Sequence, residues 1–456
     1  MKNKYHFSAL EKQVLNDIES HGGKVYLVGG IVRDMLIFNK VDYHDVDVEI
    51  YNLEIEELQE ILSKYGYVNA VGKSLGILKL DVMPNFDFAL PRIEQNTGNT
   101  HRDFNVIVDK NLSLKQAAKR RDITINAIMY EYSSVKLLDF YNGLDDLNHQ
   151  TIRMVNQDTF NEDPLRILRV AQFSARFDFK IDHKTQKQCA LMVQNKMLSA
   201  LSNERIFNEY NKLLMANKPS IGIKFLLDIQ ALDKPLMDLV NCNQRLDYHP
   251  EGNVMNHTLL VIDLAALVKN RTSNPLGFMW GALLHDIGKP EVTTPEGHAP
   301  GHNESGVRVF EQYYRSLIND KKLKKYIKTV IYYHMHLMNM MRNHSKDYSY
   351  YKLLKGIDGI MTIDDLVLIS KCDKLGRLTN SPDGVKQLDG YVKDLKNRLG
   401  SQALVPLVNG EDLINLKVPS GKLFKELLDW AYDLQMRGHD KDDIIQLIKV
   451  RVKNGT

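Results

Sequence analysis

The sequence is poor in cysteine, has little net charge and contains no long apolar run. Its three cysteines, Cys189, Cys242 and Cys372, are odd in number and widely spaced, which excludes a disulfide framework and is typical of a reducing compartment. No apolar run approaches the length of a transmembrane helix, and the first residues lack the apolar segment of a secretory signal. We therefore expect a cytoplasmic protein that makes no membrane contact.

The low net charge limits how the chain can bind nucleic acid. Its 60 lysines and arginines barely exceed its 57 aspartates and glutamates, which gives a formal net charge of +3. Any affinity for RNA must therefore come from local basic patches rather than from a general positive field. At 456 residues the chain exceeds one ordinary hydrophobic core, so we expect about two to four domains.

The hydrophobic pattern changes along the chain. Up to about residue 141, short β-type runs mix with helical segments, whereas beyond Asn161 the period of 3.6 residues persists. Turn residues cluster near 142–146, 244–253 and 400–410. We predict an α/β head at 1–141, an all-α neck and body at 142–243, a helical domain at 244–400 and a helical tail at 401–456.

The most informative segment is VYLVGGIVRDML at residues 25–36. Its four apolar residues predict a buried strand, and Gly29 and Gly30 allow a tight turn into a helix that begins near Ile31. Free N–H groups at such a turn and helix start can hold phosphate oxygens, with Arg33 within reach. The segment therefore predicts a phosphate-binding turn.

The run DVDVEI at residues 45–50 alternates strictly, so Asp45, Asp47 and Glu49 share one face of a predicted strand. Neighbouring carboxylates on a rigid strand are hard oxygen ligands for Mg²⁺, and beside a phosphate-binding turn they favour two-metal nucleotidyl transfer. Without the preceding glycines and arginine, the same acids would indicate only an exposed strand edge.

Together these two segments resemble the signature of the class II tRNA nucleotidyltransferases, the family of CCA-adding enzymes and poly(A) polymerases. Further motifs of that family follow in order along nearly the whole chain. The resemblance implies that Asp45 and Asp47 bind catalytic Mg²⁺, and that Gly29, Gly30 and Arg33 contact the triphosphate of the incoming nucleotide.

The segment NFDFALPR at residues 85–92 also alternates, and an antiparallel neighbouring strand would bring Asp87 beside the two aspartates. The family has an acidic residue here, which would orient a metal or take the proton of the attacking hydroxyl. A plain surface aspartate is the alternative. The polar, aperiodic residues 92–103 predict a mobile loop, which family members that complete the terminal A are expected to keep.

The segment KRRDITINA at residues 119–127 resembles the family motif RRDFTINA, with Ile123 in place of phenylalanine. Its basic residues, Arg121 among them, can contact phosphates. Asp122 and Asn126 have the donors and acceptors to hold ribose hydroxyls, which would favour NTP over dNTP.

The segment EDPLRILR at residues 162–169 predicts a helix start, with Asp163 and Arg166 three residues apart on one face. The family reads the incoming base with this pair. A carboxylate accepts from the exocyclic amine of cytosine or adenine while a guanidinium donates to the ring nitrogen, whereas uracil and guanine present the reverse pattern. An ordinary helix salt bridge is the alternative.

Two further arginines are expected in the nucleotide pocket. Arg169 lies one turn after Arg166, and Arg205 matches a later family motif in NERIFNE at residues 203–209, where support of the fold is the alternative role. Gln172 stands where the family often has arginine, so one phosphate or base contact of the family is in question here.

A second constellation lies downstream: His257, the pair His285 and Asp286, and Asp373. It resembles the HD phosphohydrolase superfamily, an all-helical fold that binds divalent metals. His285 and Asp286 end an apolar helix, where polar groups are costly unless something binds them. The resemblance implies that these four residues are metal ligands that activate a water against a phosphoester.

Other polar residues accompany that constellation. Lys289 would neutralise a phosphate oxygen, while His302 and His334 would hold a second metal, contact the substrate or be plain histidines. Mixed imidazole and carboxylate ligands leave Mg²⁺, Mn²⁺, Ni²⁺ and Co²⁺ all open as the HD-site ion. The helical tail is expected to bind tRNA by shape and phosphate contacts.

The resemblances imply an enzyme that adds C, C and A to tRNA 3′ ends from CTP and ATP, without a nucleic-acid template. The HD domain would add phosphatase or 2′,3′-cyclic phosphodiesterase activity. Two alternatives remain open: an enzyme that adds only A or poly(A), and an HD phosphohydrolase whose head only binds RNA.

Overall fold

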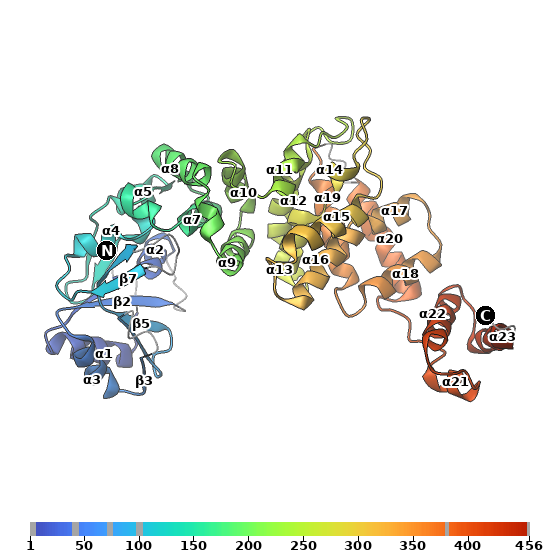
Figure 1. Cartoon of the computed structure of the whole chain (residues 1–456), viewed down its shortest axis with the longest axis horizontal. Helices are drawn as coiled ribbons and strands as arrows, with labels where there is room; N and C mark the ends of the chain where they lie inside the picture. The colour runs from blue at the N-terminus through green and yellow to red at the C-terminus, as the bar shows by residue number, and fades with distance from the viewer. Residues whose placement is uncertain (1–5, 39–44, 71–75, 97–103, 379–382, 454–456) are drawn as a thin grey trace. The chain divides into compact units, whose positions relative to one another are not determined.

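The computed structural model describes residues 6–38, 45–70, 76–96, 104–378 and 383–453. The chain forms two compact units, Met1–Leu232 and Asp233–Thr456 (Figure 1). The predicted regions with limits at 141, 243 and 400 stay predictions. Among the described residues, no helix is both long enough and apolar enough to cross a membrane.

A seven-stranded sheet forms the centre of the first unit, in the order β3-β4-β5-β2-β1-β8-β9. Its strands are β1 Lys24–Val28, β2 Val46–Tyr51, β3 Val68–Asn69, β4 Ile77–Leu80, β5 Phe86–Ala89, β8 Met129–Glu131 and β9 Lys136–Leu138. The apolar segment that predicted a buried strand is β1, which lies inside the sheet between β2 and β8.

Helices cover both faces of this sheet because its central strands are apolar on both sides. Val25 and Leu27 face a large core, whereas Tyr26 and Val28 face a smaller one. The large core includes residues of α1 (Ala9–Ser20), α2 (Gly30–Ile37) and α3 (Ile55–Ser63), and the smaller includes residues of α4 (Leu114–Lys119). The rigid sheet fixes the strand ends from which the aspartates project.

Two local predictions in the head were wrong. Asp87 lies on β5, which pairs with β2 in parallel rather than antiparallel orientation, because α3, β3 and β4 intervene and return the chain in the same direction. The stretch predicted as a loop contains β6 (Arg92–Asn96), which pairs with β7 (Phe104–Val108). Residues 97–103 lie outside the described residues.

The sheet is followed by the helical neck of the same unit. Helix α7 packs against α9 and α10. Two short strands depart from the all-helical prediction for this region: β10 (Thr151–Ile152) and β11 (Lys180–Ile181) pair in parallel and link segments distant in sequence. The neck helices are α5 Gly143–Asn148, α6 Gln157–Asn161, α7 Leu165–Phe177, α8 His183–Gln194, α9 Asn203–Leu214 and α10 Pro219–Asp228.

The second unit is built from helices around an apolar centre, with α12 and α13 packed against α16 and α19. Its first ten helices are α11 Lys234–Asn241, α12 Val254–Val268, α13 Pro275–Leu284, α14 Lys289–Val292, α15 His302–Val309, α16 Lys321–Tyr333, α17 His336–Arg342, α18 Asp347–Ile357, α19 Ile363–Leu375 and α20 Asp383–Leu399. The predicted fold class, an α/β head followed by helical regions, is therefore confirmed.

The tail has its own small core. Leu413, Leu427 and Ile444 are buried against one another, each from a different helix. The three helices are α21 Gly410–Asn415, α22 Lys422–Met436 and α23 Lys441–Lys453.

Candidate functional sites

Three aspartates meet at the edge of the head sheet. Carboxylate oxygens of Asp45, Asp47 and Asp87 lie within 4.8 Å of one another, because β2 and β5 pair with Asp47 opposite Asp87. Burial, and then the charges of Asp45 and Asp87, raise the pKa of Asp47 although Arg121 opposes the shift. Clustered hard oxygen donors whose charges repel fit a divalent cation such as Mg²⁺.

The glycine turn brings backbone close to this cluster. Gly29 has a φ of 73° and is the N-cap of α2. A Cβ atom at Gly29 would lie 3.2 Å from both Arg121 Nη1 and Asp47 Oδ2. A side chain there would be strained and would crowd the carboxylate, so glycine keeps the helix start accessible.

Arg33 forms a fixed part of the site. It is 3% exposed, and its Nη1 donates to Asn126 Oδ1 at 2.6 Å while its Nε donates to Asp34 Oδ1 at 2.7 Å. Its guanidinium also lies 5.1 Å and 4.9 Å from the ring centres of Phe173 and Phe177. Arg33 therefore has little freedom to move toward a ligand.

One cavity of about 950 Å³ brings together the predicted nucleotide-binding residues of the head and the neck. Of the predicted residues, those that line it are Gly29, Gly30, Arg33, Asp45, Asp47, Arg121, Asp122, Asn126, Asp163, Arg166, Arg169 and Arg205. Asp87 lines an adjoining cavity of about 180 Å³, together with Asp47 and Arg121. The large cavity is rich in arginine, and this charge favours an anionic ligand.

Glu49 lies beneath the basic triplet. It is 1% exposed, and Arg120 Nη2 and Arg121 Nη2 donate to its Oε1 at 2.5 Å and 2.8 Å. Burial alone would raise the pKa of Glu49, but Arg121 and Arg120 outweigh it and hold that pKa below its usual value. The buried carboxylate thus orients two arginines at the cavity wall.

Asp122 and Asn126 belong to one hydrogen-bonded group. Asn126 Nδ2 donates to Asp122 Oδ1 at 2.9 Å, and Arg169 Nε donates to Asp122 Oδ2 at 2.6 Å. Burial opposes ionisation of Asp122, but Arg169 and Asn126 outweigh it and lower the pKa of that carboxyl. The predicted ribose contacts therefore start from a preorganised, charged group.

The predicted base-reading pair is arranged differently from a helix salt bridge. Asp163 precedes α7, and its Oδ2 accepts from Arg205 Nη2 at 2.8 Å rather than from Arg166. Arg166 donates from Nη1 to the carbonyl of Thr159 and from Nη2 to that of Arg120, both at 2.6 Å. The ordinary salt bridge between Asp163 and Arg166 is thus absent among these described contacts, and each side chain is held separately.

Sequence reasoning missed several cavity residues. Phe173, Arg176 and Lys212 also line the cavity, as does Gln172, which has no charge. The signal for Arg176 is its spacing, since Arg166, Arg169, Phe173 and Arg176 repeat at helical intervals along α7. The signal for Lys212 is likewise its spacing, since it lies two helical turns after Arg205 on α9.

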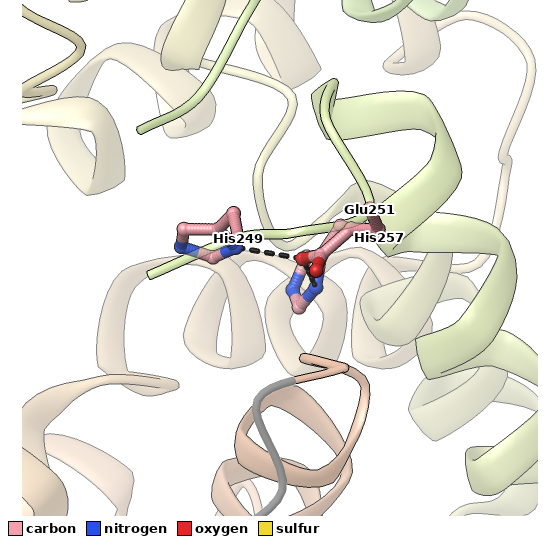
Figure 2. Close-up of side chains that lie close together, drawn as sticks. All are labelled: His249, Glu251 and His257. Carbon is pink, nitrogen blue, oxygen red and sulfur yellow. Dashed lines mark hydrogen bonds and ion pairs between the residues drawn. The ribbon is translucent and has the colours of Figure 1, made fainter. Parts of the chain in front are cut away.

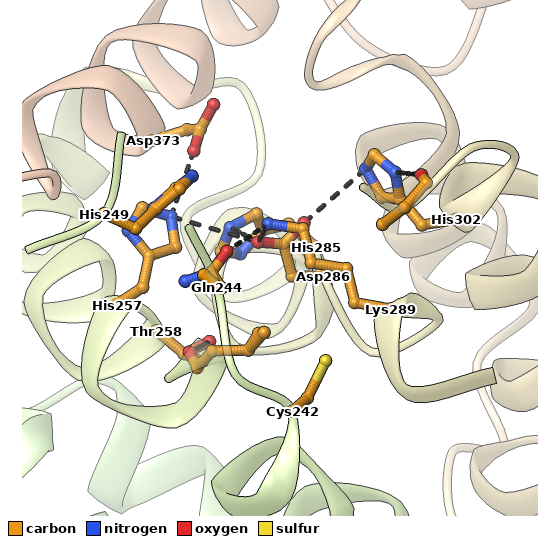
Figure 3. Close-up of polar contacts among 12 residues, drawn as sticks. Cys242, Gln244, His249, His257, Thr258, His285, Asp286, Lys289, His302 and Asp373 are labelled. Carbon is orange, nitrogen blue, oxygen red and sulfur yellow. Dashed lines mark hydrogen bonds and ion pairs between the residues drawn. The ribbon is translucent and has the colours of Figure 1, made fainter. Parts of the chain in front are cut away.

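The second site lies at the centre of the second unit, where side chains from several helices converge (Figure 3). His257 comes from α12 and Asp373 from α19, and His257 Nε2 lies 3.0 Å from Asp373 Oδ1. Asp286 lies directly after α13 and His285. Ligand atoms of His257, His285 and Asp373 form one close set, and those of Asp286, His302 and His334 form another.

Three of the histidines are oriented alike. The Nδ1 atoms of His285, His302 and His334 donate to backbone carbonyls at 2.8 Å, 2.9 Å and 2.8 Å. Each ring, when neutral, therefore has a lone pair on Nε2, and this tautomer is the one that binds metals.

The unpaired ring nitrogens fit a divalent metal. The Nε2 atoms of His302 and His334 lie 3.4 Å apart, although both carry lone pairs in the neutral rings. Burial, and then His285, lower the pKa of His334 to about 3, so its ring is neutral near pH 7. In the described part of the chain, His285 Nε2 is buried without a hydrogen-bond partner. Such atoms are costly unless a cation accepts their lone pairs.

Cationic side chains surround this centre. Lys289 Nζ lies 2.6 Å from Asp286 Oδ2, and Arg377 Nη2 lies 3.2 Å from Asp373 Oδ2. A cavity of about 400 Å³ is lined by both, together with Arg245 and Arg342. The combination of a candidate metal centre and nearby cations suits a phosphate-bearing ligand.

Two residues near this centre were missed in the sequence. His249 Nδ1 donates to Glu251 Oε1 at 2.7 Å, and the same oxygen lies 3.2 Å from His257 Nδ1 (Figure 2). The sequence indicated only a cluster of turn residues at 244–253. A histidine and a glutamate two residues apart within that cluster were the available signal.

Three family profiles match the chain. The poly A polymerase head domain profile matches residues 25–153, and the HD domain profile matches residues 254–378. A third, described as "Probable RNA and SrmB- binding site of polymerase A", matches residues 178–238. The poly A polymerase head domain and the HD domain imply that the chain depends on divalent metal ions.

Whole-chain comparisons agree with these profiles. A CCA-adding enzyme in complex with ATP has a TM-score of 0.62 at 22% identity, over 97% of this chain and 93% of that one. The Thermotoga maritima CCA-adding enzyme complexed with tRNA-CCA has a TM-score of 0.59 at 21% identity, over 97% and 94%. The multifunctional CCA protein of Alkalilimnicola ehrlichii is 32% identical over 367 residues, or 78% of this chain and 84% of that protein. At that identity and coverage, the chain belongs to the family of the multifunctional CCA proteins.

Proposed function

We propose that this protein adds C, C and A to the 3′ end of tRNA, using CTP and ATP. One observation carries the proposal: a single cavity is lined by the Asp45 and Asp47 carboxylates and by Asp163 and Arg166. Groups for phosphoryl chemistry and groups for base selection therefore face the same space. Membership of the CCA protein family supports the same activity.

In the proposed transfer, Asp45, Asp47 and Asp87 hold the Mg²⁺ ions. Bound Mg²⁺ would neutralise the triphosphate and stabilise the attacking and leaving oxygens. Backbone N–H groups after Gly29 bind phosphate oxygens at the start of α2, and the guanidinium of Arg121 adds positive charge beside them. Asp122 and Asn126 hold the ribose hydroxyls.

Base selection in this proposal needs no nucleic-acid template. Asp163 accepts from the exocyclic amine of cytosine or adenine, and Arg166 donates to the ring nitrogen. The contacts of Arg166 with two backbone carbonyls use two of the five N–H groups of a guanidinium, so donors remain for the base. Separate anchors for the two side chains keep them from pairing with each other, which supports this role.

The proposed partner is tRNA, bound through the helical neck and tail by phosphate and shape contacts. The RNA-binding profile at residues 178–238 supports the neck, and the tRNA complex of the Thermotoga maritima enzyme supports tRNA as the ligand. A cytoplasmic location is part of the proposal because tRNA and both nucleoside triphosphates are found there.

Labelled nucleotides test this proposal directly. Transcripts of tRNA that end before CCA, after C and after CC are each offered every labelled NTP. The proposal expects C on the first two and A on the third, with no U or G. Addition of A alone to the CC end would instead identify an A-adding enzyme, and a long A tail would identify a poly(A) polymerase.

We also propose a metal-dependent phosphohydrolase at the HD site, acting on phosphate or 2′,3′-cyclic phosphate at RNA ends. The unpaired Nε2 atom of His285 beside Asp286, and the cations of the cavity, support this second function. His257, His285, Asp286 and Asp373 would hold the ion, and His302 and His334 would hold a second one with Asp286. A bound ion would lower the pKa of a water for attack on phosphorus. Lys289 would bind a phosphate oxygen.

Hydrolysis of 2′,3′-cyclic AMP with Mg²⁺, Mn²⁺, Ni²⁺ or Co²⁺ tests this second function. Asp286→Asn should abolish hydrolysis while nucleotide addition continues, and Asp47→Ala should do the reverse. If hydrolysis occurs but the wild-type protein adds no nucleotide, the head is an RNA-binding module and the first proposal is wrong. If the wild type hydrolyses nothing with any ion, the second proposal is wrong.

A further inference from the structure

His257 differs from the other three histidines of the HD centre in what its Nδ1 atom faces. The Nδ1 atoms of His285, His302 and His334 each donate to a carbonyl three residues earlier. Nδ1 of His257 instead lies 3.2 Å from a carboxylate oxygen of Glu251, while its Nε2 lies 3.0 Å from Asp373. One imidazole of the centre is thus oriented by a charge rather than by a backbone dipole.

Glu251 is buried and held in a defined position. It is 9% exposed as a residue, and its Oε1 also accepts from His249 Nδ1 at 2.7 Å. Its backbone carbonyl accepts from Asn256 Nδ2 at 2.9 Å, next to His257 on α12. Turning the carboxylate away from His257 would break its contact with His249, and the Asn256 contact holds the backbone of Glu251 in place.

Glu251 also contacts the segment that follows α19, the helix that carries Asp373. Its Oε2 accepts from the backbone N–H of Leu378 at 3.4 Å. One carboxylate thus connects the segment before α12 to the segment that follows α19. Helices α12 and α19 also pack against each other, and this packing brings together two ligands separated by 116 residues.

We propose that Glu251 is a positioning residue of the HD metal centre, whose carboxylate faces Nδ1 of His257 so that Nε2 faces the ion. This inference rests on the metal-dependent function proposed above. A carboxylate that accepts from a ligand imidazole fixes its tautomer and ring orientation and increases its basicity. Loss of such a partner commonly weakens metal binding by roughly 10- to 100-fold. Glu251 itself would not touch the ion or the substrate.

Co²⁺ binding tests the proposal without relying on enzyme activity. All variants are made in the full chain with Asp45→Asn and Asp47→Asn, so that head metals do not contribute. Glu251→Gln keeps the shape of the side chain but removes its charge, and Glu251→Ala removes the contact. Glu296→Gln, an exposed glutamate of the same unit, is the matched control. Dissociation constants and visible absorption spectra of bound Co²⁺ are recorded together with melting temperatures of the metal-free proteins.

The Glu296→Gln control should match the parent protein, which carries only Asp45→Asn and Asp47→Asn, in its affinity for Co²⁺ and in its absorption spectrum. Glu251→Gln should weaken Co²⁺ binding by about tenfold or more and alter the absorption bands, and Glu251→Ala should weaken it at least as much. A lower melting temperature with unchanged affinity and spectrum would mean that Glu251 only supports the fold, and the inference would be wrong. If the parent binds no more Co²⁺ than Asp286→Asn does, the proposed metal centre itself fails. These two failures are thus distinguishable.

Discussion

Arg205 Nη2 donates to Asp163 Oδ2 at 2.8 Å, although 42 residues separate the two side chains in the sequence. Arg205 lies on a different helix, α9, and its contact fixes the carboxylate that is proposed to read the base. Selection of C and A then depends on a residue that need not touch the base. This relationship leads to the first of five predictions.

Replacing Arg205 with alanine should impair base selection. Without its partner Asp163 can rotate, so kcat/KM for CTP and ATP should fall about tenfold, a change near 1.4 kcal/mol. Incorporation of UTP and GTP relative to CTP should rise. Single-turnover addition to tRNA transcripts with each NTP measures both effects. Lys64→Ala removes an exposed lysine of the head that pairs with Asp17 and does not line the cavity, and it should leave both unchanged.

Replacing Asp47 with asparagine should abolish nucleotide addition. The loss of a metal-binding charge should cost several kcal/mol of transition-state stabilisation, or more than about a hundredfold in rate. Rates of CMP and AMP addition give the comparison, and thermal unfolding compared with the wild type shows whether the head is folded. An active Asp47→Asn variant would contradict the assignment of the head metal site.

Replacing Gly29 with alanine should damage the head. At a φ of 73° and a ψ of −135°, a backbone conformation adopted mainly by glycine, an alanine is strained by about 1–3 kcal/mol, and its Cβ would crowd Asp47 Oδ2. Nucleotide addition should fall together with the free energy of unfolding. The matched control is Gly390→Ala in α20, where a Cβ meets no atom within 4 Å. That change should be neutral or stabilising by up to about 1 kcal/mol.

Acid should destabilise the head through Asp122. Its pKa in the folded protein is lowered, so its contribution to stability is full above the pKa of an unfolded aspartate, about 3.9. That contribution is lost as the pH falls from the unfolded-state pKa toward the lower pKa of Asp122 in the folded protein. Denaturant unfolding of wild type and Asp122→Asn at several pH values measures the difference. The difference should shrink below about pH 4, and one that grew there would contradict the sign of the shift.

Two ligand sets at the HD centre predict two bound ions. In the background that lacks Asp45 and Asp47, Co²⁺ should bind with two equivalents per chain, and His302→Asn should reduce this to one. Elemental analysis after gel filtration gives the count. Chelation with EDTA should remove the ions and lower the melting temperature, because binding to the native state alone stabilises it. One equivalent in both proteins would contradict the second set.

Much of the fold could be predicted because it depends on local patterns. Apolar residues 25–28 predicted the buried strand β1, and the glycines after it predicted the turn into α2. The helical period beyond Asn161 predicted the all-helical regions. Cavity residues in the head could be predicted because one short motif supplies several of them, as the segment 119–127 supplies Asp122 and Asn126.

Other features were not predictable because they depend on how distant segments pair. The direction of β5 beside β2 follows from the intervening elements, so the antiparallel arrangement expected for Asp87 was wrong. The pairing of β6 with β7 also depends on two separate segments. The sequence of residues 92–103, which has no strand periodicity, could not indicate it.

By itself, the sequence determined which chemical groups are available: carboxylates on a strand, a glycine turn, arginines along a helix, and histidines beside aspartates. Only the tertiary structure decided which of them meet. It paired Asp163 with Arg205 instead of Arg166, and it brought Glu251 to His257. The physical reason is that hydrogen bonds and ion pairs act over a few ångströms, and those distances depend on the packing of whole helices and strands.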